Sequence, residues 1–334
     1  MYRLGLFCWL LLCCSCKSQI AEKINGVSFV ADREPAEQQH VDPVLAVNAN
    51  YAAVMPFGFI KSLSAPNVVF DSDRQWYGET KEGATQYIAL LQKNGVRVML
   101  KPQIWVWRGE FTGDIQMTSE ADWKTLERTY TDFILTYARV AEASKVAVFC
   151  IGTELEEFVE ARPGYWQSLI KQVKRIYSGK LTYASNWDEY PKTSFWDSLD
   201  YIGVDGYFPL SNERYPTKAE FKSGWQKWKV QLQEISQKYD RPILFTEFGY
   251  RSMDYTGKKP WLVDRNQTAV NLGAQADALE VLFNELWVED WFAGGFVWKW
   301  FINHDKSGGA KDNRFTPQNK PAEEVIRKQY GLRR

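Results

Sequence analysis

The chain has 334 residues, of which 41 are basic and 41 are acidic, so its formal net charge at pH 7 is zero. This balance excludes the classes of protein that hold nucleic acid through a basic surface. Hydrophobic residues make up 45% of the chain and aromatic residues 15%, which excludes an intrinsically disordered protein. The 15 Trp residues are unusual, because a buried indole N–H needs a hydrogen-bond partner. Some of them therefore pack a core, and others are candidates for a binding surface.

The first 16 residues have the pattern of an export signal. Arg3 precedes an apolar run that is too short to span a bilayer, and Ser15-Cys16 follows the run. Ser before Cys resembles a bacterial lipobox, although Cys13 stands where Leu is usual. We expect residues 1–16 to be a lipoprotein-type signal segment that ends at a lipidated Cys16; the alternative is an ordinary secretory signal cleaved elsewhere. Either signal predicts export, to the bacterial cell envelope on a lipid anchor or into the medium.

Residues 22–334 are expected to form one domain that needs no metal and no cofactor. No low-complexity linker or block of charge divides this part of the chain. Cys150 is its only cysteine and lies in an apolar run, which predicts a buried side chain and no disulfide. His40 and His304 are far apart in the sequence and have no third His or Cys beside them, so they make a poor zinc site.

Short apolar runs alternate with helical patterns along this domain. Continuous apolar runs are typical of strands that are covered on both faces, and they occupy residues 26–31, 51–56, 96–102, 146–152, 181–186, 201–206, 242–247 and 294–300. Apolar residues at three- and four-residue steps predict helices over residues 84–93, 119–141, 163–177, 217–239 and 266–289. The segment between the fifth and sixth strands is too short for a full helix.

This order of elements predicts an α/β fold, a single (β/α)8 TIM barrel. The competing fold is an open, doubly wound sheet, in which a glycine-rich loop after the first strand binds phosphate. No such loop follows residues 26–31. Because a barrel collects its functional residues at the C-terminal ends of its strands, those ends are where we look for a site.

Glu154 and Glu247 close the fourth and seventh predicted strands, whose ends share the mouth of a barrel. Two carboxyl groups that flank a bond are the requirement for glycoside hydrolysis, one of them protonated and the other ionised. The alternative for either residue is a salt-bridged position on the barrel rim. Glu156 and Glu157 follow closely, and we interpret them as solvated residues at the start of the next loop.

The other strand ends carry polar and aromatic side chains that suit sugar binding. Aromatic faces stack on the apolar face of a pyranose ring, while neighbouring polar groups bind its hydroxyls. The candidate substrate-binding residues are Lys101, Trp105, Asn186, Trp187, Asp205, Tyr207, Tyr250 and Trp298. For Asp205, three roles stay open: orienting a basic group, binding a sugar hydroxyl, or a purely structural contact.

Four motifs stand at these strand ends: Lys101-Pro102, Ile151-Gly-Thr-Glu154, Val204-Asp-Gly-Tyr207 and Thr246-Glu247-Phe-Gly-Tyr250. Together they resemble glycoside hydrolase family 113, a family of TIM-barrel β-mannanases in clan A, and the resemblance covers about residues 22–330. It implies a retaining mechanism with Glu154 as acid/base and Glu247 as nucleophile. Trp298 is similar in position to the strand-eight Trp of the clan, which implies a place beneath the cleaved sugar. Thr153 departs from the clan, where many members have Asn.

A retaining pair of carboxyl groups is expected to lie about 5–5.5 Å apart. The acid/base needs a raised pKa, which apolar surroundings and a neighbouring carboxylate supply. The nucleophile needs hydrogen-bond donors that keep it ionised, and Tyr207 is our candidate donor.

The Trp residues divide into two groups by their positions. Those in helical patterns are expected to pack the core: Trp123, Trp166, Trp225, Trp228, Trp287 and Trp291. Those at strand ends are candidates for a sugar cleft, although Trp107 and Trp300 are open to an outward orientation. Trp261 lies in the long loop 251–265, which is a candidate wall of the cleft.

The sequence thus predicts an exported glycoside hydrolase that cleaves β-1,4-mannosidic bonds in mannan or manno-oligosaccharides. Its expected partners are this carbohydrate and, through the lipid anchor alone, a membrane; no nucleic acid is expected. The alternatives are the same chemistry on β-glucan or glucomannan, and a non-catalytic carbohydrate-binding lipoprotein. Internal and end-of-chain cleavage stay open, because they depend on loops such as 102–118 and 251–265.

Overall fold

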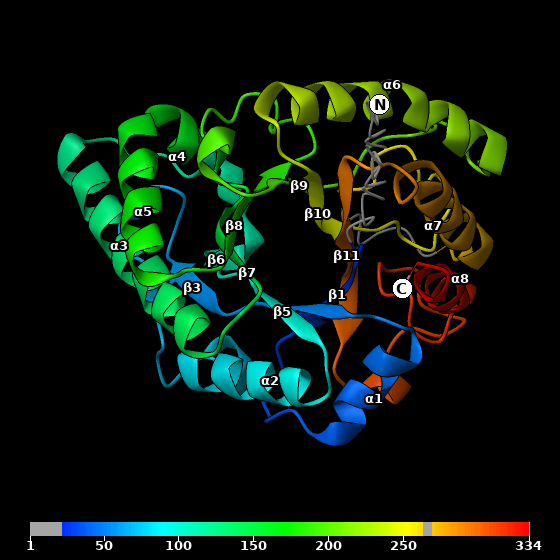
Figure 1. Ribbon diagram of the computed structural model, residues 1–334, viewed down its shortest axis with the longest axis horizontal. Helices are drawn as coiled ribbons and strands as arrows, with labels where there is room; N and C mark the ends of the chain where they lie inside the picture. The colour runs from blue at the N-terminus through cyan, green and yellow to red at the C-terminus, as the bar shows by residue number, and fades with distance from the viewer. Residues whose placement is uncertain (1–21, 263–268, 334) are drawn as a thin grey trace, which may run out of the picture.

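The computed structural model describes residues 22–262 and 269–333, which contain a closed barrel of eight parallel strands. Around the barrel the strands follow the order β1-β11-β10-β9-β8-β7-β5-β2, with the helices outside them (Figure 1). The barrel strands are β1 (Ile24–Val30), β2 (Tyr51–Val54), β5 (Arg97–Leu100), β7 (Val148–Thr153), β8 (Lys180–Asn186), β9 (Ile202–Asp205), β10 (Ile243–Phe248) and β11 (Phe292–Phe301). Each coincides with a predicted strand, so the predicted (β/α)8 barrel is confirmed.

The described chain begins at the end of the barrel where the strands start. There the Lys23 ammonium donates a hydrogen bond to the carbonyl oxygen of Glu289 (2.7 Å), just before β11. The predicted signal segment, residues 1–16 with Cys16, lies outside the described residues. Within the described ranges, no helix combines the length and the apolar character needed to cross a membrane.

The helices that surround the barrel include all five predicted ones. These are α2 (Lys81–Lys93), α3 (Glu120–Ala143), α5 (Pro163–Ile176), α6 (Lys218–Tyr239) and α7 (Leu272–Leu286). α7 begins later than predicted, because the Asn271 side chain accepts a hydrogen bond from the Ala274 N–H and caps the helix there. Between β8 and β9 the described chain has only a short 3-10 turn, Trp196–Ser198, as expected from the length of that segment.

Three helices were not predicted: α1 (Gln38–Ala46), α4 (Glu156–Ala161) and α8 (Pro321–Gly331). α1 contains Pro43, which usually ends a helix. α4 begins with Glu156 and Glu157, so these residues form a first helical turn and not the loop we expected. α8 begins with proline and buries Ile326 and Tyr330, four residues apart, so its periodicity was readable in the sequence.

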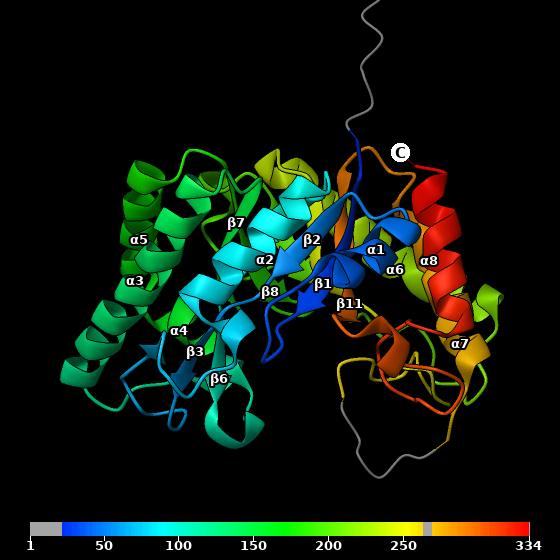
Figure 2. The same ribbon diagram turned by 90° about the horizontal axis from the view of Figure 1, so that it is seen from below.

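A small second sheet, also not predicted, extends the mouth of the barrel on one side. It contains β3 (Phe57–Ile60), β4 (Val69–Phe70) and β6 (Gln103–Val106) in the order β4-β3-β6. β3 and β6 continue β2 and β5 after Pro56 and Pro102, which have no N–H to donate and so interrupt the ladder of the barrel. Figure 2 shows β3 and β6 beyond the barrel strands, near the loop that follows β6.

The barrel interior is filled by alternate residues of its strands, as the pleat of a strand requires. One core cluster contains Ile24, Tyr51, Ala53, Met99, Val148, Cys150, Ala184, Leu244 and Phe296. The intervening residues, such as Ala52 and Val98, pack in the larger cluster that contains the helices. Cys150 is buried with a free thiol, as expected, and burial raises its pKa to about 11. Lys101 lies two residues after the inward-facing Met99, and Trp298 lies two residues after the inward-facing Phe296. By the same alternation, Lys101 and Trp298 are on the inward side of their strands at the mouth of the barrel.

Gly294 permits the close pairing of β1 with β11 that closes the barrel. Its φ is +117°, and a Cβ atom there would lie 2.2 Å from the carbonyl oxygen of Ile24. We expect Gly294→Ala to lower the free energy of unfolding by about 2–4 kcal/mol, because the clash is with backbone that cannot move aside. Urea unfolding measures this. The control is Gly164→Ala in α5, where no atom lies within 4 Å of the new Cβ; equal losses in both variants would contradict the prediction.

Candidate active site

A buried lysine joins two carboxyl groups beneath the mouth of the barrel. Lys101 follows β5, and its Nζ lies 2.6 Å from Glu247 Oε1 and 3.2 Å from Asp205 Oδ1. Burial opposes the charge on this ammonium, but the carboxylates of Asp205 and Glu247 outweigh it and raise the pKa of Lys101. The ammonium therefore stays charged and ties the ends of three strands, β5, β9 and β10, to one another.

Glu247 is held by three hydrogen-bond donors. Its Oε1 accepts from Lys101 and from Gln103 Nε2 (3.0 Å), and its Oε2 accepts from the Tyr207 hydroxyl (2.7 Å). The bond from Tyr207 is the one that the sequence led us to expect. Gln103 was missed, although it lies two residues after Lys101 and strand periodicity places both on one face. With both oxygens engaged, the carboxylate has one fixed orientation at the end of β10.

Asp205 lies below the cleft and does not line it. Its side chain is fully buried, and its Oδ1 accepts a hydrogen bond from the Thr246 hydroxyl (2.7 Å) as well as from Lys101. Burial and the charge of Glu247 raise the pKa of Asp205 to about 7, against the lowering by Lys101 and Thr246. Three roles were left open for Asp205. The structure favours the first of them, because Asp205 contacts a basic group, the ammonium of Lys101.

Glu154 has a different environment. It directly follows β7 with a left-handed backbone conformation (φ 48°), and its N–H donates to the carbonyl oxygen of Ala184 on β8 (2.8 Å). This uncommon conformation turns the side chain out of the strand and into the cleft. The residue is half-buried at the base of the cleft, and burial, followed by the charges of Asp205 and Glu247, raises its pKa well above the usual 4.5. Of the two carboxyl groups, Glu154 is therefore the one whose surroundings favour the protonated form.

Both carboxyl groups line one cleft, which has two lobes. The Trp105 lobe has a volume of about 380 Å³ and the Trp187 lobe about 440 Å³. They share four lining residues, Phe111, Glu154, Glu247 and Trp298, so they meet at the carboxyl pair. A chain molecule lying in the cleft would therefore pass the two carboxyl groups with room on either side.

Aromatic residues predicted at strand ends line the cleft, together with others from loops. Trp298 lines both lobes, and Trp105, which is 48% exposed, lines the lobe named after it. In the other lobe Trp187 stacks on Trp261, with ring centroids 4.8 Å apart and planes at 24°. Loop 251–265 thus contributes a wall through Trp261. The structure brings together the aromatic platform that the sequence suggested.

The remaining predicted residues divide between the cleft and the core. Asn186 and Tyr207 line the Trp187 lobe, and Thr153 lines the Trp105 lobe beside Glu154. Tyr250 lines neither lobe: it is fully buried, and its hydroxyl donates to the carbonyl oxygen of Phe208 (3.4 Å). Its assignment to substrate binding is corrected to core packing, because Tyr250 lies beyond the end of β10 with its side chain among core aromatics.

The helical Trp residues are in or against the core, as predicted. Trp123, Trp166, Trp225 and Trp287 are buried, and Trp228 and Trp291 pack against the same cluster. Trp300, whose orientation was open, is fully buried and packs near His304.

Lys299 and Phe315 are cleft residues that sequence reasoning missed. Lys299 lines the Trp105 lobe, where burial lowers its pKa. Its ammonium lies over the rings of Trp298 (5.4 Å) and Phe301 (5.0 Å) and makes no ion pair or hydrogen bond with a described residue. The sequence signal that could have identified Lys299 is its position directly after Trp298. Phe315 comes from the loop before α8, far from any strand end, and no sequence pattern marked it.

The two histidines act as local structural contacts. His40 takes part in a capping box with Glu37 at the start of α1, and His304 Nε2 lies 2.7 Å from Glu323 Oε1. Among the residues that the structure describes, no group of three or more His, Cys, Asp or Glu is arranged to hold a metal ion.

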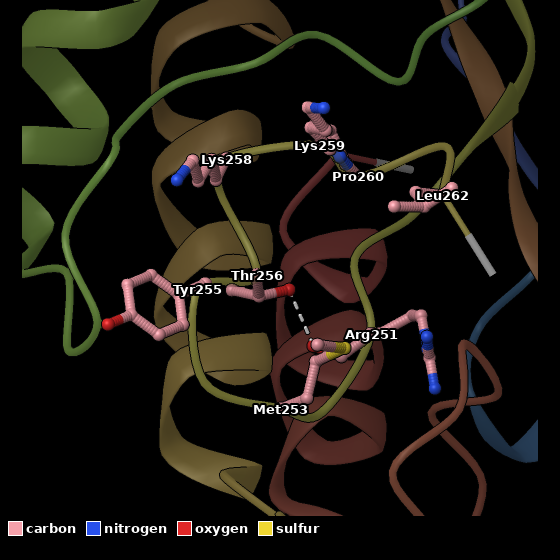
Figure 3. Close-up of a pocket in the computed structure, with 8 residues that line it drawn as sticks. All are labelled: Arg251, Met253, Tyr255, Thr256, Lys258, Lys259, Pro260 and Leu262. Carbon is pink, nitrogen blue, oxygen red and sulfur yellow. Dashed lines mark hydrogen bonds between the residues drawn. The ribbon is translucent and has the colours of Figure 1, made fainter. Parts of the chain in front are cut away.

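A third pocket lies in the loop after β10 (Figure 3). Lys258 and Lys259 lie at its edge, and the Thr256 hydroxyl donates to the carbonyl oxygen of Arg251 (2.6 Å). It shares no lining residue with either lobe of the cleft. Of these pockets, therefore, only the cleft contains Glu154 and Glu247.

Glycoside hydrolysis needs two carboxyl groups that flank a bond, and Glu154 and Glu247 line one cleft in different environments. The class of protein that this barrel and cleft define is therefore a glycoside hydrolase. The model of Glycoside Hydrolase Family 113 matches residues 31–320. The chain belongs to glycoside hydrolase family 113.

Solved structures share this fold at low sequence identity. The family 113 β-mannanase AaManA from Alicyclobacillus acidocaldarius is 23% identical, with a TM-score of 0.81, over 94% of this chain and 98% of that one. A second family 113 β-1,4-mannanase is 22% identical, with a TM-score of 0.80, over 93% and 100% of the two chains. A β-glucuronidase from Ruminococcus gnavus is 13% identical, with a TM-score of 0.59, over 92% and 49%. The comparison with curated proteins gives no match.

The raised pKa of Glu154 makes stability depend on pH. The folded state binds the proton more tightly than the unfolded state, so stability falls as the pH rises from the usual 4.5 towards the raised pKa. Glu154→Gln keeps an uncharged group there, and we expect this variant to lose less stability than wild type as the pH rises. Urea unfolding between about pH 5 and pH 8 measures the difference. Glu157→Gln, at a position outside the cleft, is the control; parallel curves for wild type and Glu154→Gln would contradict the prediction.

Proposed function

We propose that this glycoside hydrolase cleaves β-1,4-mannosidic bonds with retention, using Glu154 as acid/base and Glu247 as nucleophile. The observation that carries the proposal is the contrast between two carboxyl groups that line one cleft: burial and negative neighbours raise the pKa of Glu154, whereas three hydrogen-bond donors hold Glu247. Membership of family 113 and the fold shared with solved β-mannanases support the choice of mannan or manno-oligosaccharides as substrate.

In the first step Glu247 attacks the anomeric carbon while the proton of Glu154 passes to the departing glycosidic oxygen. The bond to the leaving sugar breaks, and an ester forms between Glu247 and the retained sugar. In the second step Glu154, now a carboxylate, takes a proton from water, and the oxygen of that water displaces Glu247. Two displacements at one carbon restore its configuration, and no cofactor takes part.

The residues around the pair have separate tasks in this mechanism. Tyr207 and Gln103 keep the attacking carboxylate in one orientation, so little reorganisation is needed when a sugar arrives. Trp298, which lines both lobes, is the proposed platform beneath the sugar at the cleavage point. The two lobes give room for sugars on both sides of the bond.

We also propose that the enzyme acts outside the cytoplasm, anchored by lipid at Cys16. The support is the N-terminal sequence, where an apolar run precedes Ser15-Cys16. A polymeric substrate such as mannan is met outside the cell, and this agrees with the proposed location.

The first test is the activity itself. We expect purified enzyme to release reducing sugar from mannan and manno-oligosaccharides, and Glu247→Gln to lower turnover by roughly a thousandfold or more while oligosaccharide still binds. NMR of early products should show the β-anomer first. Screening xylan, cellulose and glucomannan in parallel distinguishes the related substrates. If neither wild type nor Glu247→Gln releases sugar although both bind it, the chain is a carbohydrate-binding protein; early appearance of the α-anomer would exclude retention.

Azide tests which Glu has which role. In Glu154→Ala, Glu247 still forms the ester with an activated substrate such as dinitrophenyl β-mannobioside, and azide then displaces it to give a β-glycosyl azide. In Glu247→Ala, azide takes the place of the missing nucleophile and gives an α-glycosyl azide. We expect azide to raise the rate of each variant, with these opposite products seen by NMR. The same product from both variants, or the reverse assignment, would contradict the roles; Glu157→Gln serves as the carboxyl control that azide leaves unchanged.

A further inference from the structure

A second groove adjoins the Trp105 lobe, beside the small sheet at the barrel mouth. This distal groove has a volume of about 820 Å³, about twice the 380 Å³ of the Trp105 lobe. Its lining includes Phe59, Val69, Arg74, Trp107, Arg108 and Glu110. Glu110 lines the Trp105 lobe as well, so the two hollows meet at this residue.

One strand connects the catalytic pair to the distal groove. Along β6, Gln103 contacts Glu247 and the exposed Trp105 lines the cleft, while the side chains of Ile104 and Val106 between and after them are buried. Trp107 comes directly after β6, at the start of a short 3-10 turn (Trp107–Gly109), and lines the distal groove. Four residues along an extended strand cover roughly 13 Å, a distance that a short run of sugar rings can span. Gln103, Trp105 and Trp107 thus form a row that leads away from the carboxyl pair.

Trp107 has no packing reason for its position. It is 66% exposed, the most exposed Trp in the described chain, and it makes no ring contact or hydrogen bond with a described residue. The backbone after it is left-handed at Arg108 (φ 68°) and at Gly109 (φ 74°), and non-glycine residues rarely adopt this conformation without a functional reason. This turn brings Glu110 back to the junction of the two hollows. An exposed indole on a constrained loop is typical of a binding surface.

The polar groups of the distal groove are free to bind hydroxyls. Lys61, Arg74, Arg108 and Glu110 are exposed and make no ion pair or hydrogen bond with a described residue. Phe59 and Val69 supply apolar surface between them. A sugar chain presents the matching surfaces, an apolar ring face for the indole and hydroxyls for the charged groups.

We propose that the distal groove binds the part of the substrate polysaccharide that extends beyond the Trp105 lobe, with Trp107 stacked on one of its sugar rings. The proposal rests on the proposed function, since it assigns a second stretch of the same carbohydrate chain. Continuity with the cleft through Glu110 and β6 favours this occupant over a protein partner. Its consequence is a preference for long chains: short oligosaccharides that fill only the cleft gain nothing from Trp107.

The test compares Trp107→Ala with wild type on manno-oligosaccharides of increasing length and on polymeric mannan. We expect kcat/KM for the shortest cleaved substrate to stay within about twofold, and kcat/KM for long substrates to fall about five- to tenfold, the loss of one aromatic stacking contact. Tyr215→Ala is the matched control, because Tyr215 is 63% exposed and lines neither the cleft nor the groove. A thermal melt checks that both variants fold.

The outcomes separate this inference from the proposed function. If wild type cleaves mannan but Trp107→Ala lowers kcat/KM equally at every chain length, or at none, the distal groove does not bind the extended chain. If wild type cleaves no mannan, the proposed function fails, but the groove can still be tested by binding. Affinity electrophoresis in galactomannan gels compares Glu247→Gln with the double variant Glu247→Gln/Trp107→Ala. Equal migration of the two proteins overturns the inference about the groove. A change of oligomeric state in Trp107→Ala, seen by sedimentation, would assign the groove to a second copy of the chain and also overturn it.

Discussion

The interaction on which the rest of the site depends is the contact of the buried Lys101 ammonium with Glu247 and Asp205. A buried charge is stable only when it is paired and hydrogen-bonded, and Lys101 is the cation within hydrogen-bond reach of both carboxylates. Because its two partners lie at the ends of two different strands, the same contact also fixes β5, β9 and β10 relative to one another at the barrel mouth. Loss of the ammonium would leave two carboxyl groups close together without compensation, and Glu247 would lose its orientation as well as its counter-charge.

That contact also explains why Glu154 differs from Glu247. The carboxylates of Glu247 and Asp205 are compensated directly by Lys101, whereas Glu154 has burial and two negative neighbours as its main influences, and these raise its pKa. In the proposed mechanism the formation of the ester removes the charge of Glu247 at the moment when Glu154 becomes charged. The total charge in the cleft therefore stays constant through the step, which matters because a change of charge is costly where water is excluded.

Much of this was readable in the sequence, and the failures have physical reasons. Continuous apolar runs located all eight barrel strands, and the rule that function lies at strand ends located Glu154, Glu247, Tyr207 and Trp298. The small sheet was missed because Pro56 and Pro102 read as strand ends, although the chain resumes pairing after each. Tyr250 was misplaced because the prediction put it at a strand end, whereas it lies beyond the end of β10 and its side chain packs among core aromatics.

The surplus of Trp follows from the kind of substrate proposed. A neutral sugar chain offers no charge for long-range attraction, so an enzyme that holds it relies on contact area and on hydroxyls. Buried indoles such as Trp166 and Trp225 pack in the core, and Trp166 also donates a hydrogen bond to the carbonyl oxygen of Phe158 (3.3 Å), so their tasks are structural. Trp105, Trp187 and Trp298 stand at strand ends around the carboxyl pair, where a rigid, flat and partly polar side chain has no simple substitute. In the proposed function, Trp105, Trp187 and Trp298 are therefore the part of the Trp content that binds substrate, and the chain's zero net charge is compatible with a neutral substrate.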